Sequence, residues 1–267
     1  MTHAMPGAAR RRLLLATVLL PLGRPATAQV RDLNDAINKA GRQRMLSQRC
    51  AKAWLALGQG VRAEQAEKAL GDSMALFDRQ LVELRSFVAT PELKGTYQSL
   101  DTAWSTYKST LVGSAPQRAA ADALVEQGAR VLQLAHQGTT QLEQQSGRPV
   151  GRLVNIAGRQ RMLSQRVAAL YLAATWRVQP AGTQRALDEA HAEFVQAHRL
   201  LKAAPETTPA IRAELELAEQ QFGFLDSALK SLRAGSADAR AQADVFTTSE
   251  RVLQVLDRAT GLYAALA

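Results

Sequence analysis

Two arginines, Arg44 and Arg161, are the residues whose type and spacing could do chemistry. Each lies in the nine-residue sequence GRQRMLSQR, which occurs at residues 41–49 and again at 158–166. Around each arginine the other residues of the stripe step by four and three positions, the spacing of a helix-bundle seam. A guanidinium keeps its proton, so burial in such a seam requires an anion or hydrogen-bond acceptors beside it. The pattern predicts two buried cationic donors.

A glycine lies one helical turn before each arginine, at Gly41 and Gly158. Glycine inside a helix costs up to ~1 kcal/mol relative to alanine. Its usual compensation is the close approach of another backbone or of a ligand. A guanidinium presents a planar fork of donors that matches a small oxyanion. The glycine and arginine together indicate a pocket for such an anion.

A purely structural role for the arginines is the alternative. Two acidic positions are kept in both halves of the chain, Asp72 with Glu189 and Asp101 with Glu219. Either pair could neutralise the arginines inside their own bundles, because a buried guanidinium is often simply paired.

The chain is a tandem repeat of two units, predicted at residues 30–146 and 150–267. Beyond the shared motif, segments correspond at offsets of 117, 118 and 121 residues, for example 130–133 with 251–254. Glycine and proline breakers divide each unit into four helices. Helices of this length with short connections favour antiparallel bundles. We therefore expect an all-α protein made of two tandem antiparallel four-helix bundles.

The composition agrees with a helical, folded protein. The chain has 267 residues, of which 46% are hydrophobic, 21% charged and 5% aromatic. Few aromatic residues and no long β-branched runs argue against a β-sandwich or barrel. The single cysteine, Cys50, excludes an intrachain disulfide and a cysteine-based zinc site.

The N-terminal residues 1–28 have the layout of a secretory signal peptide. Three arginines at residues 10–12 precede ten apolar residues at 13–22, and a small-x-small cleavage sequence follows at 26–28. The apolar run is half of the ~20 residues that a membrane-spanning helix needs. We expect a cleaved, periplasmic protein, exported by the general or the twin-arginine route. Four of the 33 basic residues and none of the 24 acidic ones would be removed, leaving 29 − 24 = +5. Without a basic stripe and stacking aromatics, nucleic acid is not an expected partner.

Other reactive residues give weaker signals. His191 and His198 are two helical turns apart, too far to chelate one metal ion unaided. His136 has no histidine counterpart in the second unit, and Cys50 corresponds to Val167 and is expected in the core. No phosphate loop, paired-acid site or nucleophile with a base stands out. We expect no enzyme activity, no catalytic residue, no metal and no cofactor.

Residues 38–49, NKAGRQRMLSQR, resemble the conserved box of nitrate/nitrite sensor kinases. The same residues resemble the PilJ-type N-terminal domain of type IV pili methyl-accepting chemotaxis transducers. The resemblance extends to both units. It implies that the box lies on the first helix of a periplasmic four-helix bundle, where two such helices meet across a homodimer axis and hold one nitrate.

The resemblance also implies the site residues. The ligand contacts would be Gly41 with Arg44, and Gly158 with Arg161. Lys39 matches the family's lysine, but the second unit has Ile156 there. The supporting residues would be Ser47, Arg49, Ser164 and Arg166.

These expectations combine into one arrangement. The two units would pair as a pseudo-dimer within one chain, with Arg44 and Arg161 on either side of a single anion that relieves their repulsion. The expected function is an exported, stand-alone sensory-type protein that binds a nitrate- or nitrite-like anion and passes its signal to a membrane protein. A further homodimer is left open. The alternative is a ligand-free interaction module that docks on a membrane chemoreceptor or a type IV pilus complex.

Overall fold

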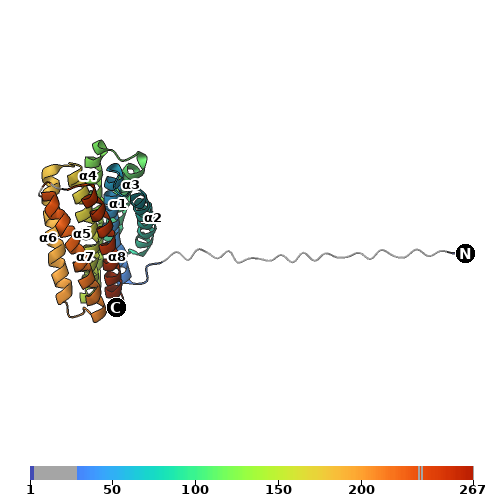
Figure 1. Ribbon diagram of the computed structural model, residues 1–267. Helices are drawn as coiled ribbons and strands as arrows, with labels where there is room; N and C mark the ends of the chain where they lie inside the picture. Colours follow the sequence, from blue (N-terminus) through green and yellow to red (C-terminus); the bar gives the residue numbers. More distant parts are fainter. Residues whose placement is uncertain (3–28, 234, 236, 267) are drawn as a thin grey trace.

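The computed structural model describes residues 1–2, 29–233, 235 and 237–266. In this part of the chain all regular structure is helical, in eight helices (Figure 1). The all-α class and the two tandem four-helix bundles are confirmed. The first bundle contains α1 (Leu33–Gly58), α2 (Ala63–Phe87), α3 (Pro91–Gly113) and α4 (Arg118–Ser146). The second contains α5 (Pro149–Thr175), α6 (Pro180–Ala203), α7 (Pro209–Arg233) and α8 (Ala239–Ala264).

The helix ends follow the local chemistry of the sequence. Thr90 caps α3 by accepting a hydrogen bond from the Leu93 N–H, and Pro91 takes the first helical position. Asp32 caps α1 in the same way. Gly147 ends α4 in the left-handed conformation (φ 59°), which glycine adopts without steric cost. Pro209 begins α7 as Pro91 begins α3, after Thr208, whose hydroxyl accepts a hydrogen bond from the Ile211 N–H.

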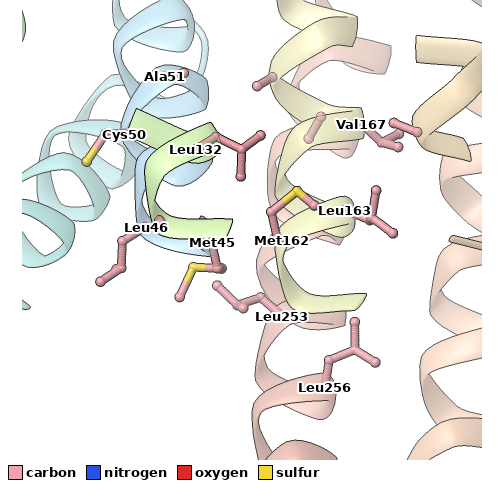
Figure 2. Close-up of a cluster of buried hydrophobic side chains, with 14 of the residues drawn as sticks. Met45, Leu46, Cys50, Ala51, Leu132, Met162, Leu163, Val167, Leu253 and Leu256 are labelled. Carbon is pink, nitrogen blue, oxygen red and sulfur yellow. The ribbon is translucent and has the colours of Figure 1, made fainter. Parts of the chain in front are cut away.

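The two motif helices, α1 and α5, form the centre of the molecule. Their mutual contact is the most extensive between any two helices, and α4 and α8 pack on their flanks. Figure 2 shows Met45 and Leu46 of α1, Met162 and Leu163 of α5, and neighbours from α4 and α8 in one apolar cluster. The outer helices α3 and α7 each bury one largely apolar stripe, which includes Trp104 in α3. This core holds the motif away from solvent.

The proposed signal peptide, residues 1–28, lies almost entirely outside the described residues. Within the described part of the chain, none of the helices combines the length and apolar character that crossing a bilayer requires.

Candidate anion site between the repeated helices

The α1 and α5 backbones touch at Gly41 and Gly158. A Cβ atom added to either glycine would lie 3.6 Å from the Cα atom of the other. A Cβ atom at either position would already be in van der Waals contact with the opposite backbone, and its tighter contacts, at 3.2–3.3 Å, would be with guanidinium Nη2 atoms. Side chains larger than alanine would therefore have to displace the other helix or the arginines. Of the two explanations that the sequence allows for a mid-helix glycine, the approach of another backbone is observed directly.

Arg44 is fully buried, as the seam pattern predicts, and reaches across to the other motif helix. Its Nη2 donates to the carbonyl oxygen of Asn155 on α5 (3.1 Å), and its Nη1 lies 3.2 Å from Nδ1 of His136 on α4. Its Nε has no hydrogen-bond partner. None of the carboxylates in the described residues forms an ion pair with Arg44, so only neutral acceptors contact its guanidinium, while the charge of Glu143 acts on it from beyond ion-pair distance.

Arg161 is equally buried and makes the mirrored crossing to α1. Its Nη2 donates to both oxygens of Asn38, at 3.1 Å to the carbonyl and 2.8 Å to the side-chain amide. Its Nη1 donates to Asp257 on α8 at 2.5 Å. Arg161 therefore has a carboxylate from its own unit, whereas Arg44 has none.

The two guanidinium groups converge on the glycine crossing. The Nη2 atoms of Arg44 and Arg161 lie 3.2 and 3.5 Å from the Cβ position of Gly41, and both lie 3.3 Å from that of Gly158. Burial, with the charges of Arg159 and Arg161, lowers the pKa of Arg44 to about 9. Burial also lowers the pKa of Arg161 to about 10, although Asp257 opposes this. Because both guanidiniums stay protonated at neutral pH, two like charges are held beside one pair of glycines.

The different partners of the two arginines trace to one pair of equivalent positions. The offset of 121 residues that relates 130–133 to 251–254 also relates His136 to Asp257, since 257 − 121 = 136. Arginine has no acceptor, so His136 must accept through Nδ1 and carry its proton on Nε2. Burial and the charge of Arg44 lower the pKa of His136 to about 4, which keeps the imidazole neutral. From the sequence, His136 was noted only for lacking a histidine counterpart and Asp257 was not named, although the unequal pair in the repeat alignment was the available signal.

The acidic residues that the structural alternative named do not contact the arginines. Asp72 pairs with Lys68, Glu189 with Arg185, Asp101 with Arg85 and Glu219 with Lys202. All four are partly exposed on the outer helices, so that version of the alternative is wrong. A carboxylate does neutralise Arg161, but it comes from α8.

The serines and glutamines of the motif have internal structural contacts. Ser47 and Ser164 each donate to the carbonyl oxygen of the arginine three residues earlier, at 2.8 Å. Gln43 donates to the Phe77 carbonyl oxygen on α2, and Gln160 makes the same bond to Phe194 on α6. The two glutamine bonds fix each motif helix against its neighbour, whereas the serine bonds stay within the motif helix.

Lys39 and Arg49 are held by carboxylates on another face of α1. Lys39 forms ion pairs with Glu83 (2.8 Å) and Asp35 (3.2 Å), which occupy its charge. Arg49 donates through Nε and Nη2 to Glu250 of α8. Lys52, which the sequence did not single out, is fully buried and pairs with the same glutamate at 2.6 Å.

Arg166 takes a different position from its counterpart Arg49. It lines a cavity between α4, α5 and α6, and among the described residues it makes neither a hydrogen bond nor an ion pair. Burial lowers its pKa, a shift that nearby Glu189 opposes. Arg49 is thus in a salt bridge, whereas Arg166 forms none with the described residues.

Of the remaining reactive residues, Cys50 is buried in the core as expected, and the two histidines of α6 pack against neighbouring side chains. His198 is buried and stacks on Phe194, and His191 bonds Asp226 at 2.6 Å. Burial raises the pKa of Cys50 to about 12, which removes nucleophilic character at neutral pH. Within the described residues, histidine, cysteine and acidic side chains do not gather in a group of three that could hold a metal ion.

Comparison with known families places the chain. The family model for the type IV pili methyl-accepting chemotaxis transducer N-terminal domain, PilJ, matches residues 26–129 and again residues 142–243. The chain therefore belongs to the PilJ family and contains the domain twice. No curated protein and no solved structure matches it. The first match ends inside α4, and the second begins inside α4 and ends inside α8, so our unit bounds of 30–146 and 150–267 stay a prediction.

PilJ is a family of sensory and signalling domains of chemoreceptors rather than of enzymes. This chain therefore has two PilJ domains in tandem and is a sensory or interaction module related to chemotaxis transducers.

Proposed function

We propose that this chain is a sensory module whose two motif helices bind one small oxyanion such as nitrate or nitrite. Gly41, Arg44, Gly158 and Arg161 form the site. The observation that carries the proposal is the convergence of two fully buried guanidiniums on the glycine crossing. An anion between them would relieve their repulsion and supply acceptors for the Nε atoms that lack partners.

Coupling between anion binding and the pairing of α1 with α5 would make the site a sensor. A ligand that binds only the paired arrangement of α1 and α5 stabilises that arrangement in proportion to its occupancy. The signal would then pass to a membrane signalling protein, outside the cytoplasm, in keeping with the chemotaxis-transducer family. Lys39 would contribute at the periphery, since it is already engaged by Glu83 and Asp35.

Titration calorimetry on the chain starting at residue 29, in a chloride-free buffer of low ionic strength, tests this proposal. Nitrate and nitrite should each bind at one site per chain. Arg44→Gln and Arg161→Gln should each raise the Kd at least tenfold, because each removes one charge-assisted donor. Arg85→Gln, which alters an exposed ion pair, is the control and should leave the Kd unchanged.

Circular dichroism and thermal unfolding of each variant would show that lost binding is not lost folding. Absence of heat with every oxyanion would overturn the proposal and favour the ligand-free docking module. Binding that persists in both arginine variants would also overturn it.

A further inference from the structure

The repeat builds two equivalent cavities, one on each flank of the motif helices. The first-flank cavity, about 560 Å³, lies between α1, α2 and α8 and includes Arg42 and Arg49. The second-flank cavity, about 310 Å³, lies between α4, α5 and α6 and includes Arg159 and Arg166. The two pairs of arginines correspond at an offset of 117 residues. Because the arginines correspond, the other lining residues that differ between the two cavities indicate which ligand each cavity could bind.

The arginines of the first-flank cavity are neutralised by α8. Arg42 pairs with Asp257 at 2.8 Å, and Arg49 pairs with Glu250 at 2.5 Å. The guanidiniums there have carboxylate partners from the chain itself, so this cavity has little need of an external anion.

The second-flank cavity lacks both of these carboxylates. At the offset of 121 residues, α4 has Ala129 where α8 has Glu250, and His136 where α8 has Asp257. Arg166 accordingly has no ion-pair partner among the described residues, and Arg44, which also lines this cavity, has only neutral acceptors. Two guanidiniums are left without the carboxylates that their counterparts have.

The acidic residues of this cavity do not fill that role. Glu193 forms an ion pair with Arg159, and Glu189 forms one with Arg185 of its own helix at 3.4 Å, so that its charge acts on Arg166 only from beyond ion-pair distance. His136 adds a donor, because its Nδ1 accepts from Arg44 and its proton must therefore lie on Nε2.

Apart from Gln133, the rest of the cavity lining is apolar, and it favours one kind of ligand. Leu132, Met162, Ala186 and Ala190 line the same cavity. A bare inorganic anion would leave these surfaces unused, whereas a short hydrocarbon skeleton would bury against them.

We infer that the second-flank cavity binds a small organic carboxylate, with its carboxylate on Arg44 and Arg166 and its carbon skeleton against Leu132 and Met162. The ligand thus supplies the negative charge that Glu250 and Asp257 supply on the other flank. This site goes beyond the proposed oxyanion site: it shares Arg44, but it uses Arg166 in place of Arg161 and the glycines.

The sharpest test introduces into the second-flank cavity a carboxylate equivalent to Glu250. Butyrate and succinate are titrated into the chain starting at residue 29, and into its Ala129→Glu, Arg166→Gln and Ala119→Glu variants. Ala129→Glu places an acid where Glu250 stands in the other unit and should weaken carboxylate binding more than tenfold without lowering the melting temperature. Ala119→Glu makes the same change at an exposed position of α4 and should alter the Kd less than twofold.

The two sites are separated by a crossed comparison. Arg166→Gln should remove butyrate and succinate binding but retain nitrate binding, and Arg161→Gln should do the reverse. Nitrate binding without any carboxylate binding overturns this inference alone. Carboxylate binding that depends on Arg166, without nitrate binding, supports it and overturns the proposed oxyanion site. Carboxylate affinity unaffected by both Ala129→Glu and Arg166→Gln overturns the inference as well.

Discussion

His136 and Asp257 lie at equivalent positions of α4 and α8, and each contacts the buried arginine of its own unit. His136 accepts from Arg44 as a neutral imidazole, whereas Asp257 meets Arg161 as a carboxylate at 2.5 Å. One arginine therefore depends on an ion pair within the chain and the other does not. The two halves of the site should differ in how strongly a single substitution destabilises them.

Asp257→Asn should lower the free energy of unfolding by about 2 kcal/mol. The substitution leaves fully buried Arg161 without an anionic partner, and a charge of this kind is costly once unpaired. The partial exposure of Asp257 keeps the loss below that of a fully buried pair. Unfolding in guanidinium chloride at pH 7 measures this loss in the free energy of unfolding. Asp72→Asn, which disrupts only an exposed pair with Lys68, should change stability by less than ~0.5 kcal/mol. Equal effects of the two variants would contradict this expectation.

Acid should destabilise the junction between α1 and α8 through Glu250. Burial alone would raise the pKa of Glu250, but Lys52 and Arg49 lower it to about 2. A carboxylate whose folded-state pKa lies below its unfolded value stabilises the fold above the unfolded pKa, near 4.3. That contribution, about 3 kcal/mol, should be lost as the pH falls from about 5 to about 2.

The check is a comparison of the original chain with Glu250→Gln across this pH range. The variant should be less stable at pH 7, and the difference should shrink steadily toward pH 2. A difference that stays constant with pH would mean that packing, rather than the charge of Glu250, holds the junction.

Gly58→Ala and Gly71→Ala should shift stability in opposite directions. A Cβ atom on Gly58 would overlap the Trp176 ring, which packs beside Trp54 at a centroid distance of 6.0 Å. Overpacking of this kind costs about 1–3 kcal/mol. A Cβ atom on Gly71 meets nothing within 4 Å, so alanine there should stabilise α2 by up to ~1 kcal/mol. Thermal unfolding of both variants measures the difference, and a stabilised Gly58→Ala would show that the Trp176 ring moves aside freely.

The helices and the burial of the arginines could be predicted because local signals carry them. Proline after threonine specified the starts at Pro91 and Pro209, and the four-three stepping placed Arg44 and Arg161 inside. These features depend on residues within one or two helical turns. A single sequence is sufficient for them.

The partners of the arginines could not be predicted in the same way. Glu250 of α8 reaches across to Arg49 and Lys52 of α1, two hundred residues away in the chain. Such a contact depends on how the two bundles sit against each other, and no local pattern encodes that. Aligning the repeats as far as His136 would have revealed the uneven pair with Asp257, but not which arginine each one meets.

Duplication within one chain gives this protein a freedom that a symmetric dimer of single domains lacks. In a dimer of identical subunits every substitution occurs twice, so both flanks would have to hold histidine or both aspartate. Here α4 and α8 are encoded separately, and one flank has acids where the other has alanine and histidine. The molecule is therefore only pseudo-twofold symmetric, and its two flanks present different charges to any receptor that docks on it.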